Sequence, residues 1–76
     1  MSEETNRLAT AMVEIERRFV AERPAGVVVR GDDDEALATA LVAAKLLIPI
    51  EVIPGEPAGV APAQAVNRHL IALLAQ

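Results

Sequence analysis

Apolar side chains recur at helical spacing in the first third of the chain. They step by four, three and four positions, at Leu8, Met12, Ile15 and Phe19. This spacing places them on one face of a helix. The helix is expected over residues 5–22, because Pro24 disfavours helical backbone at the residue before it.

Two short runs rich in β-branched residues predict strands at residues 26–30 and 49–53. The first run is apolar without alternation, which is typical of a strand buried on both faces. Pro49 cannot donate to a strand ladder, so we expect it at the start of its strand or at an edge. The segment between the runs is long enough for a crossover helix, which makes the two strands parallel.

Two more helices are expected, at residues 34–47 and 62–75. The first has a predicted buried stripe at Leu37, Ala40, Leu41 and Ala44. Asp32 followed by Glu35 resembles a capping box, and the run of aspartates complements the positive end of the helix dipole. The last helix has a stripe at Val66, Leu70 and Leu73. Ile71 and Leu74 widen that stripe, which favours an oligomer interface at these two residues, with ordinary core as the alternative.

The pattern therefore predicts one small α/β domain over residues 1–76, in the order helix–strand–helix–strand–helix. Two parallel strands are too few for a stable free-standing sheet. Apolar residues make up 53% of the 76-residue chain and aromatic residues only 1%, so the core must be thin and aliphatic. A homo-oligomer that completes the fold is expected, with a dimer favoured by symmetry; a protein partner is the alternative.

Charge and residue types exclude several functions. The net charge of −4 without a basic stripe argues against nucleic acid and against anionic membranes. There is no cysteine and only one histidine, so no zinc site and no metal site is predicted, and no cofactor is expected. The first residues lack a signal-peptide pattern, and no apolar run reaches the length of a membrane span, which favours a cytoplasmic protein.

An ordered series of motifs runs through the chain. Residues 27–32 read Val-Val-Val-Arg-Gly-Asp, an alanine-rich segment follows, and residues 48–50 read Ile-Pro-Ile. Pro62 and then Asn67 and Arg68 mark the last predicted helix. This series resembles the non-hydrolysing UDP-N-acetylglucosamine 2-epimerases. Those enzymes have a strand ending in His-Gly-Asp-Thr-Thr, an Ala/Leu-rich helix, a strand opening with Ile-Pro-Val, and a helix that begins with Pro-Glu-Glu and continues to Asn-Arg.

The resemblance implies a Rossmann-like half, the second part of the first of two domains. It implies a catalytic position at Asp32 and ligand-binding positions at Asn67 and Arg68. It also places two carboxylates of the family at Pro54 and Gln64, neither of which can transfer a proton. The resemblance thus implies that the fold is kept and that the chemistry of UDP-N-acetylglucosamine 2-epimerisation is lost.

Three readings of function stay open. The first is a non-catalytic epimerase-like module that acts through self-association or a protein partner. The second is a vestigial nucleotide-sugar-binding protein, or an epimerase-like enzyme, with a cleft between protomers. The third is a deliberately excised or engineered piece, for which no cellular activity exists. The run of four acidic residues at positions 32–35 could also hold Mg²⁺ or Ca²⁺, but capping explains it as well, since consecutive residues at a helix start do not converge on one point.

Overall fold

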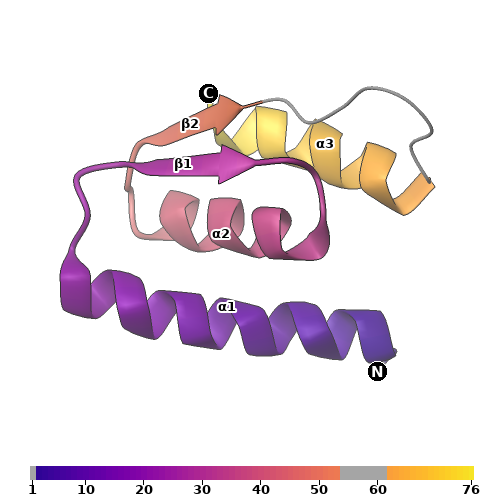
Figure 1. The fold of residues 1–76 in the computed structure, drawn as a ribbon, viewed down its shortest axis with the longest axis horizontal. Coiled ribbons are helices and arrows are strands. Elements are labelled where there is room, and N and C mark those ends of the chain that lie inside the picture. The colour runs from indigo at the N-terminus through magenta and orange to yellow at the C-terminus, as the bar shows by residue number, and fades with distance from the viewer. Residues whose placement is uncertain (1, 54–61) are drawn as a thin grey trace.

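The chain forms three helices and a two-stranded parallel sheet, which confirms the predicted order (Figure 1). The computed structural model describes residues 2–53 and 62–76. The elements are α1 (Glu3–Glu22), β1 (Val27–Arg30), α2 (Asp34–Lys45), β2 (Ile50–Ile53) and α3 (Pro62–Leu74). Each differs from its predicted bounds by at most two residues. Among the described residues, no helix is long and apolar enough to cross a membrane.

Helix α1 begins and ends at clear local signals. The Ser2 hydroxyl accepts a hydrogen bond from the Thr5 N–H at 3.1 Å, and the helix starts at Glu3, two residues before the predicted start at residue 5. It ends where Arg23 adopts a left-handed conformation before Pro24. Ile15 and Phe19 are buried as the predicted stripe requires. Leu8 and Met12 are partly buried against the same cluster.

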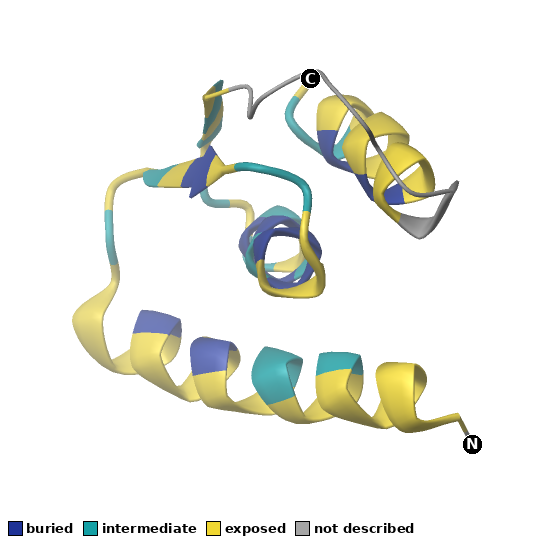
Figure 2. Cartoon of the chain, turned by 45° about the vertical axis from the view of Figure 1, so that its right-hand side comes forward, coloured by how far each residue is buried: buried dark blue, intermediate teal, exposed yellow. Residues whose placement is uncertain are grey.

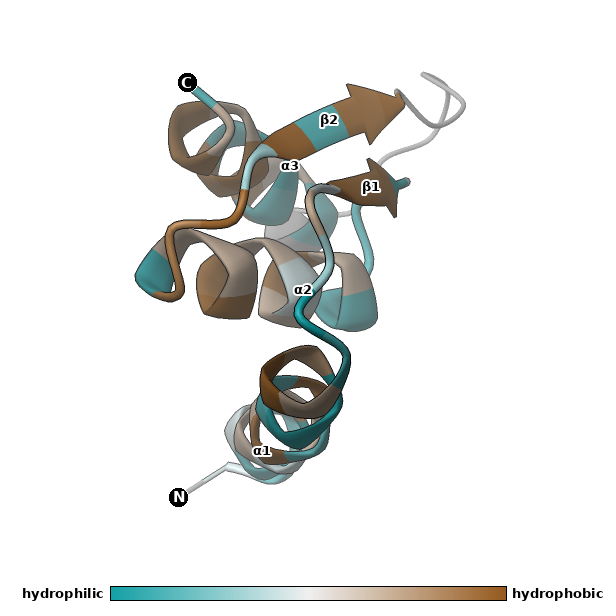
Figure 3. Cartoon of the chain, turned by 90° about the vertical axis from the view of Figure 1, so that its left-hand side faces the viewer, coloured by the Kyte–Doolittle hydropathy of each residue, from teal (hydrophilic) through white to brown (hydrophobic). Residues whose placement is uncertain are grey.

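The two strands pair in parallel with Val27 opposite Ile50 and Arg30 opposite Ile53. Pro49 precedes β2, where its carbonyl accepts from the Val27 N–H at 2.9 Å, so the proline is placed as expected. In the part of the chain that the structure describes, no third strand is present, and each strand keeps one edge without a strand partner. All three helices lie on one side of this sheet (Figure 3).

Helix α2 is the centre of the protein and contacts all four other elements. One core cluster joins it to β1 and α3, through residues that include Leu37, Ala40, Val29 and Ile71. A second cluster joins it to α1. The helix is therefore buried around most of its circumference (Figure 2). The predicted single stripe was too narrow: Leu41 and Ala44 are only partly buried, and the residues facing α1 are buried as well, namely Ala38, Val42 and Ala43.

Helix α3 turns a different face inward from the one predicted. Ile71 is 1% exposed, and Leu74 packs against the same core cluster. Ile71 therefore belongs to the core of the protomer and has no surface left for an oligomer. The residues predicted to be buried are exposed instead: Val66, Leu70 and Leu73. The stripe Asn67–Ile71–Leu74 has the same helical spacing, so periodicity fits both faces equally well.

The end of α2 shows a strained position. The Ile48 N–H donates to the Ala43 carbonyl at 2.8 Å and the Leu47 N–H donates to the Ala44 carbonyl at 3.2 Å. This is a Schellman motif, which normally has glycine at the left-handed position. Here Leu47 occupies that position with φ 59° and is 90% exposed, so its side chain packs on almost nothing.

Replacing Leu47 by glycine should therefore stabilise the protein. Removal of the left-handed strain, less the extra chain entropy of glycine, should add about 0.5–1 kcal/mol to the free energy of unfolding. For a domain of this size this corresponds to a rise in Tm of about 3–6 °C, measured by circular dichroism. Leu47→Ala is the matched control, because it removes the side chain and keeps the strain. Equal Tm values for the two variants would contradict the interpretation.

Candidate functional site

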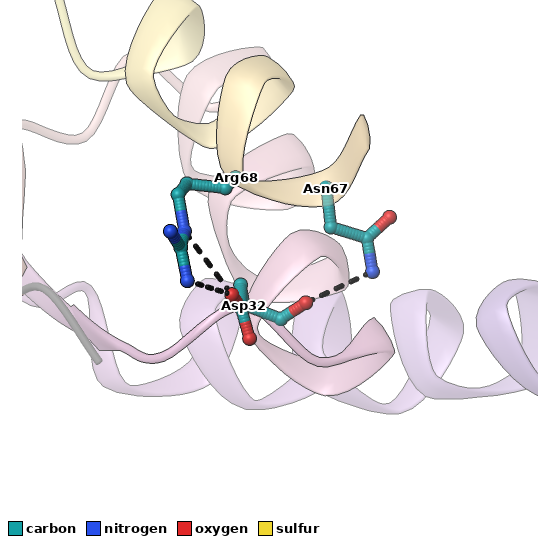
Figure 4. A network of polar contacts seen from close by, with 3 residues as sticks. All are labelled: Asp32, Asn67 and Arg68. Atoms are coloured by element: carbon teal, nitrogen blue, oxygen red, sulfur yellow. Dashed lines mark hydrogen bonds and ion pairs between the residues drawn. The ribbon is translucent and has the colours of Figure 1, made fainter. Parts of the chain in front are cut away.

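The three residues singled out by the resemblance meet at the carboxyl ends of the strands. Gly31 follows β1 with φ 77°, a left-handed turn that leads to Asp32. Asn67 and Arg68 stand on the first half of α3 and face this turn (Figure 4). In open α/β sheets this end is where ligands usually bind. The structure thus brings together Asp32, Asn67 and Arg68, which are about 35 positions apart in sequence.

Asn67 is the buried polar residue of the site. It is 7% exposed, and its Nδ2 donates to the Asp32 carbonyl oxygen at 3.0 Å and to Asp34 Oδ1 at 3.0 Å. A side-chain amide nitrogen has two hydrogens to donate, and both are used here. Asn67 therefore ties α3 to the start of α2, and its amide nitrogen has no hydrogen left to donate to a ligand.

Arg68 forms an ion pair with Asp32. Its Nε and Nη2 both donate to Asp32 Oδ2, at 3.2 Å and 2.8 Å (Figure 4). The Arg68 side chain is 45% exposed and that of Asp32 is 18% exposed, so the pair lies at the surface. Each charge is compensated by the other. A guanidinium held in this way is less available to an anionic ligand.

The cap of α2 differs from the predicted one. Asp33, not Asp32, is the N-cap, and its Oδ1 accepts from the Ala36 N–H at 2.8 Å. Asp32 is thereby left to pair with Arg68, and Asp34 to accept from Asn67. The acceptor role of Asp34 was missed from the sequence. Its signal was Asn67 itself, a polar residue within the stripe that continues to Ile71 and Leu74.

The acidic run does not form a metal site. Among the described residues, no group of three or more histidine or acidic side chains could hold a metal ion. A hollow of about 560 Å³ lies between α1 and the start of α2. Its lining includes Arg7 and Arg18 beside the acidic side chains, and these positive charges disfavour a cation there. The two positions where the family has carboxylates add none here: Gln64 is exposed on α3, and Pro54 lies outside the described residues.

A comparison with known proteins finds no family model that matches this chain, and no curated protein or solved structure that matches it significantly. The resemblance to the epimerases therefore stays a prediction from sequence motifs. The contacts of the site form a polar connection between α2 and α3, in which the side chains of Asp32, Asp33, Asp34, Asn67 and Arg68 are all engaged.

Replacing Asn67 by alanine should destabilise the protein, because the Asp32 carbonyl and the Asp34 carboxylate lose a buried donor. We expect a loss of about 1–2 kcal/mol in the free energy of unfolding, after allowing for the better helix propensity of alanine. Arg68→Ala should cost less than about 1 kcal/mol, since its ion pair is exposed to solvent. Urea denaturation measures both. His69→Ala, at an exposed neighbouring position, is the control. If Asn67→Ala lowers the free energy of unfolding no more than His69→Ala does, the structural role of Asn67 is wrong.

Proposed function

We propose that this chain is a non-catalytic α/β module, half of a Rossmann-like arrangement, that acts through self-association or by binding a protein partner. The observation that carries the proposal is the distribution of exposed aliphatic side chains. Val28 and Ile53 are exposed on the sheet, and Val66, Leu70 and Leu73 on α3. Val13 and Val20 on α1 are exposed as well. Exposed apolar residues on several elements of so small a protein are typical of surfaces that bind another molecule.

The polar residues of the site also support a non-catalytic role. Proton transfer needs a positioned acid or base that can reach a substrate. Asp32 is paired with Arg68, and Asn67 is used to hold the helices together. The same contacts give these residues a structural role, because they fix the position of α3 on α2.

The second candidate is a vestigial nucleotide-sugar-binding protein. One specific observation favours it: Asp32, Asn67 and Arg68 converge at the end of the sheet where ligands commonly bind. A ligand phosphate would have to displace Asp32 from Arg68. In this reading the cleft would lie between two protomers.

Sedimentation equilibrium over a dilution series tests self-association, and calorimetric titration tests ligand binding. We expect the average mass to rise from one chain towards two with concentration, and no heat of binding with UDP or UDP-N-acetylglucosamine. A well-folded monomer at every concentration would contradict self-association. Saturable heat with one nucleotide per chain or per dimer, lost in Arg68→Ala, would favour the second candidate instead.

A further inference from the structure

The sheet has one face that no described residue covers. Side chains alternate between the two faces of a strand. The inward face carries the side chains that pack into the core: Val27, Val29, Ile50 and Val52. The outward side chains are all exposed: Val28, Arg30, Glu51 and Ile53. All three helices lie on the inward side (Figure 3), so the outward face is open over both strands.

This outer sheet face, made of those four outward residues, has a definite pattern. Val28 is 53% exposed and Ile53 is 38% exposed. The register puts Val28 opposite Glu51 and Arg30 opposite Ile53. The two aliphatic residues therefore occupy one diagonal of the face, and the two opposite charges occupy the other. Neither the Arg30 side chain nor the Glu51 side chain forms a hydrogen bond or ion pair with another residue that the structure describes.

We propose that a second copy of this chain packs its outer sheet face against this one, around a two-fold axis along the Val28–Ile53 diagonal. Such an axis exchanges the two corners of the other diagonal. Arg30 of each copy then lies over Glu51 of the other, while Val28 meets Val28 and Ile53 meets Ile53. Strands related in this way cross steeply, as in the orthogonal class of sheet packing.

The arrangement of the four outward side chains favours this axis over the other two-fold axes in the plane of the sheet. An axis parallel to the strands would place Val28 over Glu51 and Arg30 over Ile53. An axis across the strands would place Val28 over Arg30 and Glu51 over Ile53. Both would bury a charge against an aliphatic side chain without a partner, which is unfavourable. Only the Val28–Ile53 diagonal brings opposite charges together and aliphatic residues together.

The same pattern favours a second copy over another protein. A two-fold interface must be self-complementary, with residue i meeting residue j and residue j meeting residue i. One cation and one anion at exchangeable corners meet this condition, and an arbitrary partner would not require it. Charge complementarity of this kind fixes register and suppresses wrong partners.

The dimer is expected to be weak. Two strands of four residues span about 13 Å by about 10 Å, which is smaller than the roughly 800 Å² per partner of a standard interface. The dimer should therefore dissociate readily on dilution, and its population should depend on protein concentration. The inference rests on the proposed self-association, and it adds which surface and which contacts carry it.

Charge exchange at the two corners tests the contact. Arg30→Glu gives a face with two acids, and Glu51→Arg gives a face with two bases. The dissociation constant of the dimer should therefore rise about tenfold for each variant alone. The double variant Arg30→Glu/Glu51→Arg should regain wild-type dimerisation. An equimolar mixture of the two single variants should form a heterodimer. Sedimentation equilibrium measures dimerisation of the two single variants, the double variant and the mixture. The controls are Arg17→Glu and Glu22→Arg, which are exposed on α1 and make the same changes in net charge.

The outcomes separate this inference from the proposed function. If both single variants dimerise like the wild type, the outer sheet face is not the interface, although self-association stands. Leu70→Glu would then be the variant that weakens the dimer, if the exposed stripe of α3 is the contact. If the wild type is monomeric at every concentration, this inference fails together with the proposed self-association, and of the proposed function only binding of a protein partner is left. Circular dichroism at the lowest concentration confirms that each variant is folded, as exposed positions allow.

Discussion

The packing of α2 between α1 and the sheet is the constraint on which the rest of the structure depends. Ala38, Ala40 and Ala43 have no exposed surface, and each lies where another element approaches the helix closely. Larger side chains at these positions would separate the layers, since a close-packed core has no room for added methylenes. The two core clusters share α2, so a shift of this helix would disturb both.

The polar contacts at the start of α2 follow from the same constraint. A helix buried on two sides needs its first N–H groups satisfied locally, and Asp33 does this as N-cap. Asn67 then connects α3 to the same turn through the Asp32 carbonyl and the Asp34 carboxylate. No described buried side-chain nitrogen or oxygen is left without a partner. Polar groups that are satisfied in this way make a core rigid and help to specify one arrangement of the helices.

The small size of the fold leaves part of its sheet exposed. With the three described helices on one side, the sheet has one face and two edges that no described residue covers. A chain of this length buries only about 60% of its unfolded surface, so association is a natural source of further stability. The opposite charges on the outer sheet face make a second copy a suitable cover, because the face is complementary to itself.

The sequence by itself determined the elements, their order and most of their ends. Helical spacing located α1, β-branched runs located both strands, and Pro24 and Pro49 marked two boundaries. Only the tertiary structure decided the rotation of α3. Its apolar face is wide enough for either Leu70 or Ile71 to point inward, and periodicity cannot choose between them. The choice falls to Ile71 because Asn67 must reach the start of α2, and a helix that buries Asn67 buries the residue four positions later as well.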